Sequence, residues 1–169
     1  ENGLIENEVT SVRQMGDTMV IANPQHLNFY IHGKVYQGPQ LPEVNPAVRI
    51  LDLEYDRRGG LLIASNRGGA LRYKDGRFEP VHRRIEDFYC RAIEPYRDGF
   101  VYATSGGVFY VAEDQSLEKI NNQKSVRNII VLNDTIYLCK HSNGITRISD
   151  NGKVAHYKSD ELQLSSTYD

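Results

Sequence analysis

The residue types that most often carry chemistry are spread thinly along this sequence. The five histidines lie at positions 26, 32, 82, 141 and 156, without the short spacings that bring metal ligands together. Cys90 and Cys139 belong to no CxxC pair, and both fall in apolar runs typical of strands. We therefore expect no metal site and no cofactor, and we expect the cysteines to be two buried free thiols.

Two glycine-rich stretches superficially resemble catalytic or phosphate-binding motifs. Ser105-Gly106-Gly107 lies between two apolar runs, whereas a hydrolase nucleophile sits on a turn from a strand into a helix. Asn66-Arg67-Gly68-Gly69 has the composition of a β-turn or bulge and not of an anion-binding loop before a helix. With no paired carboxylates either, we predict that the chain is noncatalytic and has no catalytic residue.

The elements that must position the polar residues are short repeated strands. The stretch from Gly16 resembles the stretch from Asn133, 117 residues later, and two further copies lie between them. Aligned on the small residue that ends the second apolar run of each copy, the intervals are 42, 39 and 36 residues, between Ala22, Ala64, Ala103 and Cys139. A period of about 39 residues is that of a propeller blade or of a helical-pair repeat.

Strand signals decide between these two architectures. Each unit has an alternating segment, a short apolar run, an aromatic and β-branched run, and a fourth segment after a turn such as Asp75-Gly76. Asp-Gly and Asn-Gly between apolar runs are strong hairpin signals. A helical repeat would need two amphipathic helices per unit, and a β-sandwich would not require four-strand self-similarity. The predicted fold is all-β, made of β-propeller blades of four antiparallel strands.

Blade boundaries follow from the repeat. We predict blades over residues 3–40, 41–81, 82–120 and 121–157, and the first strand of a fifth blade over 158–169, which resembles residues 49–56. Residues 1–169 would then form a single partial propeller. Because the chain opens with Glu1 and four blades leave apolar faces uncovered, we expect it to be part of a larger ring. Its expected partners are the remaining blades of the same protein, or another copy that associates through the open blade edges.

Composition excludes several functional classes. The chain of 169 residues has 40% hydrophobic and 25% charged residues, with a formal net charge of −2. Basic residues form no stripe, which argues against a nucleic-acid partner. No apolar run approaches the 18 or so residues of a membrane helix, so we expect no membrane segment in this chain.

One end of the blades is the expected ligand-binding face. Loops that enter the first strand and loops that join the second strand to the third share this face, around the central channel. Amides and guanidinium groups there suit sugar hydroxyls or a carboxylate, although loops are also polar by default. The candidate ligand-binding residues are His26, Asn66, Arg67, Arg84, Lys140 and His141.

Four stretches together resemble one known repeat: Gly3 to Val12 (GLIENEVTSV), Asp56 to Ser65 (DRRGGLLIAS), Ala70 to Phe78 (ALRYKDGRF) and Tyr102 to Val111 (YATSGGVFYV). They resemble the two-component regulator propeller repeats, found in the periplasmic sensor region of hybrid two-component histidine kinases of Bacteroidetes. The tryptophan of that repeat is absent, and its place is taken by Val20, Leu62, Val101 and Tyr137.

This resemblance implies a function. The chain would be a periplasmic, noncatalytic sensor segment that recognises an oligosaccharide or another small ligand derived from a glycan, with a histidine kinase elsewhere in the parent protein. A protein-interaction scaffold built of propeller blades is the alternative. A propeller enzyme would need carboxylates or histidines clustered on the channel face, and the candidate loops hold almost none.

Overall fold

The computed structural model describes residues 3–42, 47–140 and 144–158, and these residues form four separate antiparallel sheets. We name the sheets A to D in chain order. Sheet A comprises β1 (Ser11–Met15), β2 (Thr18–Ala22), β3 (His26–Ile31) and β4 (Lys34–Gln40). Sheet B comprises β5 (Ile50–Asp56), β6 (Gly60–Ser65), β7 (Gly69–Lys74) and β8 (Arg77–Pro80). Sheet C comprises β9 (Cys90–Tyr96), β10 (Gly99–Thr104), β11 (Gly107–Val111) and β12 (Leu117–Asn121). Sheet D comprises β13 (Val126–Leu132), β14 (Thr135–Lys140), β15 (Ile145–Ile148) and β16 (Val154–Tyr157).

Within each sheet the strand order follows the chain, so every neighbouring pair is a hairpin. This confirms the predicted four repeats of four antiparallel strands. The predicted strand of a fifth blade lies, except for Lys158, outside the described residues. The division of residues 1–169 into a single partial propeller stays a prediction.

Turn chemistry explains why the hairpins form where they do. The β3–β4 turn has positive φ at His32 (47°) and Gly33 (82°), and the β7–β8 turn has it at Asp75 (50°) and Gly76 (79°). Two consecutive positive φ angles match the twist of flanking strands, and Gly, Asn and Asp adopt them at least cost. The Asp75-Gly76 pair in the sequence therefore indicated a real hairpin turn.

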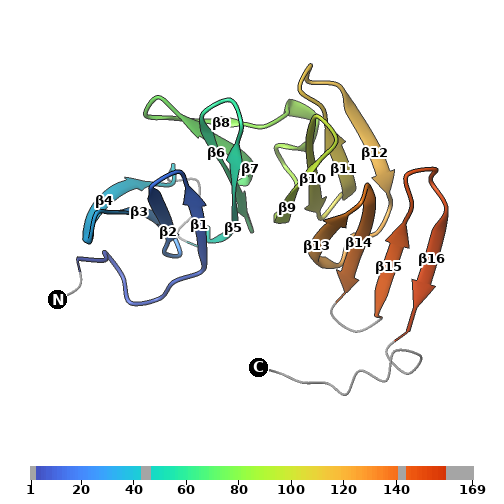
Figure 1. Ribbon diagram of the computed structural model, residues 1–169, viewed down its shortest axis with the longest axis horizontal. Coiled ribbons are helices and arrows are strands. Elements are labelled where there is room, and N and C mark those ends of the chain that lie inside the picture. Colours follow the sequence, from blue (N-terminus) through green and yellow to red (C-terminus); the bar gives the residue numbers. More distant parts are fainter. Residues whose placement is uncertain (1–2, 43–46, 141–143, 159–169) are drawn as a thin grey trace.

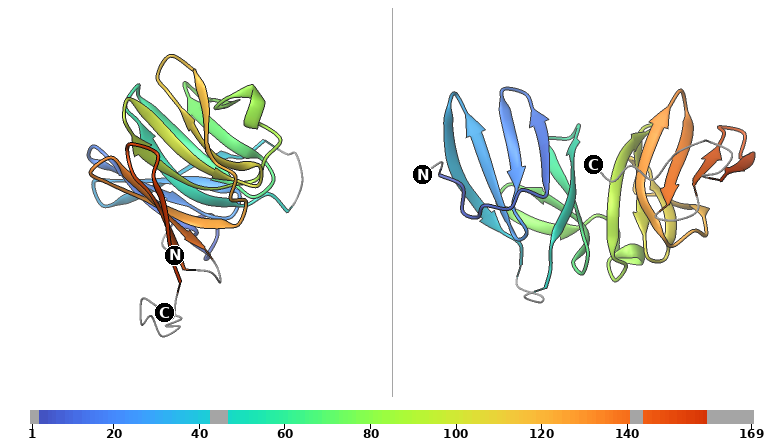
Figure 2. Two further views of the ribbon diagram at one scale, coloured as in Figure 1. Left: turned by 90° about the vertical axis from the view of Figure 1, so that its right-hand side faces the viewer. Right: turned by 90° about the horizontal axis from the view of Figure 1, so that it is seen from below.

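The four sheets follow one another along an arc from sheet A to sheet D (Figure 1). The first strands β1, β5, β9 and β13 line its inner side, and the last strands β4, β8, β12 and β16 lie at its periphery. Figure 2 shows the same succession from two further directions. Neighbouring sheets meet face to face, as the blades of a propeller do.

Three apolar clusters hold the sheets together, one at each junction. The A–B cluster includes Val20 and Leu53, the B–C cluster includes Leu62 and Tyr102, and the C–D cluster includes Val101 and Leu138. Of the residues at the position of the missing tryptophan, Val20, Leu62 and Val101 are fully buried in these clusters, whereas Tyr137 is half-buried. Packing between sheets thus replaces any single continuous core.

Both cysteines are free, as predicted, but only one is fully buried. Cys90 lies in the B–C cluster, while Cys139 on β14 is partly exposed. The prediction of two buried thiols was therefore wrong for Cys139. Unlike Ile136 and Leu138 on the same strand, it does not belong to the C–D cluster.

Helical structure is limited, among the described residues, to a short 3-10 turn, η1 (Arg83–Ile85). No described helix is long and apolar enough to cross a membrane.

Candidate functional site

The topology places the described candidate residues at one end of the sheets. His26 begins β3, Asn66 and Arg67 form the β6–β7 turn, Arg84 lies in η1 and Lys140 ends β14. All of these positions adjoin the turns between the second and third strands or a connection between sheets. His141 lies outside the described residues. Whether this end binds a ligand stays a prediction.

Two of these residues have structural partners. His26 Nδ1 lies 2.8 Å from Glu6 Oε1, which ties residues before β1 to the start of β3. Asn66 Oδ1 accepts a hydrogen bond of 2.7 Å from the backbone N–H of Arg49, in the connection that enters sheet B. Both side chains therefore help to fix the chain at this end.

The arginines are more available for a ligand. Arg67 and Arg84 are exposed, and the backbone N–H of Arg84 is held by His82 Nδ1 at 3.0 Å. Lys140 is half-buried, and its backbone N–H donates to Gly144 O at 3.2 Å. Among the five described candidates, no two are joined by a hydrogen bond or ion pair.

Ser105 also has a structural partner. It lies in the turn between β10 and β11, as predicted, and its N–H donates to Tyr89 O at 2.8 Å. The Tyr89 N–H in turn donates to Ser105 Oγ at 3.1 Å. This reciprocal pair fixes the entry to sheet C against the turn.

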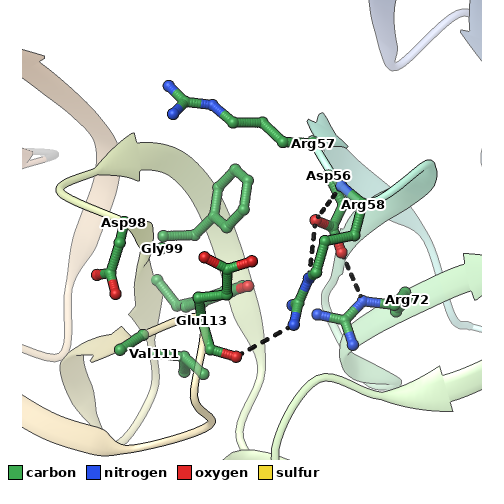
Figure 3. A pocket seen from close by; sticks show the side chains of 11 residues that line it. Asp56, Arg57, Arg58, Arg72, Asp98, Gly99, Val111 and Glu113 are labelled. Carbon is green, nitrogen blue, oxygen red and sulfur yellow. Dashed lines mark hydrogen bonds and ion pairs between the residues drawn. The ribbon is translucent and has the colours of Figure 1, made fainter.

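A pocket of about 180 Å³ opens between sheets B and C at the opposite end, beside the turns between first and second strands (Figure 3). Its floor is apolar, with Phe100, Tyr102 and Val111 all buried. Its wall and rim are charged: Asp56, Arg57, Arg58, Arg72, Asp98 and Glu113.

Asp56 holds two arginine side chains in place at this pocket. Its Oδ1 accepts hydrogen bonds from the backbone N–H of Arg58 at 3.0 Å and from Arg58 Nε at 3.3 Å. Its Oδ2 lies 2.8 Å from Arg72 Nε. Burial alone would raise the pKa of Asp56, but the Arg58 N–H and the two guanidinium groups hold it below its ordinary value. One buried carboxylate thus fixes two arginines.

Arg58 extends across the junction between sheets B and C. Arg58 Nη1 donates to Glu113 O at 3.2 Å, which links the β5–β6 turn to sheet C (Figure 3). Arg57 is exposed at the rim. Guanidinium groups above an apolar floor can bind a carboxylate, or the hydroxyls of a sugar whose ring lies on the floor.

Sequence reasoning missed this pocket. In the sequence, Asp56 to Ser65 is only one of the stretches that resemble the propeller repeat. The adjacent Asp56, Arg57 and Arg58 were a signal, but Arg72 and Glu113 reach the pocket only through strand pairing and the junction between sheets.

A second polar cluster lies along the inner strands and joins successive sheets. Arg13 on β1 binds sheet B through Nε to Leu53 O at 2.8 Å and through Nη2 to Glu54 Oε2 at 2.9 Å. Asp52 on β5 accepts the N–H of Ile93 on β9 at 3.0 Å. Burial raises the pKa of Asp52. These bonds fix the register between neighbouring first strands.

The inner strands hold two further carboxyl groups with perturbed pKa values, Glu54 on β5 and Glu94 on β9. Burial raises the pKa of Glu54 despite the opposing Tyr55 N–H and Arg13. Burial, and next the charge of Glu54, raise the pKa of Glu94. Among the described residues no group of three or more His, Cys, Asp or Glu is arranged to hold a metal ion.

No family model matches the chain, and no curated protein matches it. Among solved structures, the extracellular domain of the putative hybrid two-component system BT4673 from B. thetaiotaomicron matches with a TM-score of 0.73 and 17% identity, over 94% of this chain and 23% of that one. The corresponding domain of BT3049 from the same organism matches with a TM-score of 0.70 and 18% identity, over 92% of this chain and 22% of that one.

An enzyme is also among the similar structures. Virginiamycin B lyase from Staphylococcus aureus matches with a TM-score of 0.67 and 14% identity, over 90% of this chain and 57% of the lyase. The chain therefore spans a little over half of the lyase and less than a quarter of the two extracellular domains. These likenesses establish the fold, that of β-propeller blades, and they are consistent with the two-component regulator propeller repeats predicted from the sequence.

Proposed function

We propose that this chain is a noncatalytic, ligand-sensing propeller segment of an extracytoplasmic two-component sensor, situated in the periplasm. The observation that carries the proposal is the match of its four sheets to the extracellular domains of BT4673 and BT3049. The repeat motifs in residues 3–12 and 56–78 support it independently. The likeness to a lyase is weaker in TM-score.

A glycan-derived ligand suits the polar groups available at both ends of the sheets. Arg67 and Arg84 are exposed at the end predicted from the sequence, with His26, Asn66, Lys140 and His141 as the further candidates. At the other end, Arg57, Arg58 and Arg72 surround an apolar floor. Guanidinium groups bind carboxylates bidentately, so an acidic sugar fits them better than a neutral one.

A thermal-shift screen against neutral and acidic oligosaccharides tests this function. A ligand at 100 times its Kd adds about 2.7 kcal/mol, on the order of 5–10 °C for a domain of this size. We expect a shift confined to one glycan class. If R67A with R84A abolishes the shift, the predicted end binds the ligand, whereas loss in R57A points to the pocket. K153A, which removes an exposed cation between β15 and β16 that belongs to neither group of candidates, serves as the control.

A panel without any shift would contradict the sensor proposal for this chain. The protein-interaction scaffold would then take its place, with the exposed apolar faces of the end sheets as its contact surfaces.

A further inference from the structure

The pocket between sheets B and C has walls of opposite charge. Arg57, Arg58 and Arg72 come from sheet B, at the β5–β6 turn and on β7. Asp98 and Glu113 come from sheet C, at the β9–β10 turn and just after β11. In Figure 3 the two carboxylates lie on the sheet C side of the pocket, across from Arg58 and Arg72. This separation of charge restricts which ligands the pocket can bind.

The sheet B wall holds its hydrogen-bond donors in fixed positions. The Asp56 carboxylate lies 3.3 Å from Arg58 Nε and 2.8 Å from Arg72 Nε, so both guanidinium groups are held at the same atom. Each guanidinium group carries further donors on Nη1 and Nη2. Among the described residues, Arg58 Nη2 and both Nη groups of Arg72 have no hydrogen-bond partner. Two fixed groups with unused donors suit a carboxylate that bridges them.

The sheet C wall offers hydrogen-bond acceptors. Glu113 is exposed, and it is fixed at the pocket through its main-chain O, which accepts from Arg58 Nη1 at 3.2 Å. Asp98 Oδ1 accepts the hydroxyl group of Tyr110. In the part of the chain that the structure describes, neither carboxylate forms an ion pair with an arginine of sheet B. A compact ammonium group with rotatable donors suits this wall.

The floor between the walls is apolar, and the pocket is small. Phe100, Tyr102 and Val111 form the floor and are all buried. The volume of about 180 Å³ is below the range of about 300–1,000 Å³ that is usual for drug-sized ligands. The pocket therefore suits one small molecule with an apolar body.

A ligand of a single charge satisfies only one wall. A carboxylate at Arg58 and Arg72 adds negative charge opposite Asp98 and Glu113, and like charges oppose binding. A cation faces the same difficulty at the arginines. A ligand that carries both charges satisfies both walls.

We propose that the pocket between sheets B and C binds a small zwitterion with an apolar body, namely a free apolar amino acid. The carboxylate of the ligand bridges Arg58 and Arg72, its ammonium group faces Glu113 and Asp98, and its side chain lies on Phe100. This inference does not rest on the proposed glycan ligand. Direct binding of amino acids has its own readout, so either proposal can fail without the other.

Isothermal titration calorimetry with L-leucine tests the proposal, beside two probes that each lack one charged group. Isocaproate has the carboxylate and the apolar body of leucine without the ammonium group, and isoamylamine has the ammonium group without the carboxylate. We expect a Kd of about 1 mM or below for leucine, a range open to a ligand of this size. Each probe should bind at least tenfold more weakly. Absence of leucine binding would overturn the proposal. So would isocaproate that binds as tightly as leucine, because the pocket would then be a plain anion site.

Variants of the two walls locate the ligand. E113Q keeps the main-chain bond to Arg58 but removes an exposed charge, so it should weaken leucine binding at least tenfold without weakening isocaproate. R58K keeps the positive charge but lacks the paired Nη donors, so it should weaken both ligands.

E86Q is the matched control. Glu86 is exposed after η1, at the opposite end of the sheets, and its replacement should leave all the Kd values unchanged. Unchanged melting temperatures show that the variants are folded. If R58K destabilises the chain, the exposed E113Q still decides the test. Leucine binding equal to that of the parent in E113Q would contradict the proposal, because the ammonium group would then be held elsewhere.

Discussion

At the scale of single residues, the carboxyl groups of the inner strands and of the pocket have opposite electrostatic roles. Asp56 is fixed between two arginines, whereas Glu94 is half-buried near another acid, Glu54. The pKa of Asp56 is lowered and that of Glu94 is raised, so the two groups contribute stability in different ranges of pH.

Replacing Glu94 should stabilise the protein above neutrality. A carboxyl group with a raised folded pKa contributes stability that is complete below its unfolded pKa and is lost as pH rises through the folded pKa. E94Q keeps the site neutral, so we expect it to exceed the parent by several tenths of a kcal/mol, up to about 1, at pH 8. Urea denaturation at pH 8 and pH 4 checks this, since the advantage should vanish at the lower pH. An equal gain in exposed E79Q would contradict the assignment.

Replacing Asp56 should have the reverse effect. A lowered folded pKa contributes stability that is present above the ordinary value of 3.8 and is lost as pH falls through the folded pKa. D56N leaves Arg58 and Arg72 without their carboxylate, which costs about 3 kcal/mol at pH 7. The measurement is the same denaturation series, and the loss should shrink only in acid below pH 3.8. D75N, in an exposed turn where Asn suits the positive φ of 50°, is the control and should be nearly neutral.

At the scale of elements, close approach of neighbouring strands limits which residue can begin a strand. Gly99 opens β10, and a Cβ there would lie 2.0 Å from Val111 O on the paired strand. G99A must therefore separate β10 from β11, and we expect a loss of about 3 kcal/mol. G16A is the control, because no atom lies within 4 Å of its Cβ and only its φ of 58° opposes alanine, at a cost of about 1 kcal/mol. Equal melting temperatures for the two variants would contradict this explanation.

A feature could be predicted from the sequence where the residues that produce it are adjacent in the chain. The β7–β8 hairpin was predicted because Asp75-Gly76 and the apolar runs beside it are adjacent in sequence. The pocket was not, because Arg58 meets Glu113 only after two sheets have formed and packed. His26 was expected in the loop between the second and third strands, but it is the first residue of β3, and its pairing with Glu6 depends on the path of residues before β1. Local patterns thus determined the blades, and contacts between blades determined the pocket.

At the scale of the whole molecule, the two thiols report on different events. Cys90 is buried at the B–C junction, and burial raises its pKa far above the ordinary value; Cys139 is partly exposed and its pKa is raised less strongly. In native buffer we expect C90S to react with a maleimide at least tenfold faster than C139S. The C139S rate should rise with urea as the B–C junction opens. Similar rates for the two variants in native buffer would contradict the burial of Cys90.

The consecutive order of strands within each sheet has a consequence for how the protein is made. Every hydrogen-bonded strand pair joins neighbours in the chain, so a sheet can form as soon as its own four strands have emerged from the ribosome or from a translocation channel. Closure of short loops is fast, and contacts that are local in sequence favour rapid folding. Each finished sheet can then pack against the next one as that sheet forms. The same order that builds an arc of blades thus lets the molecule assemble progressively from its N-terminal end.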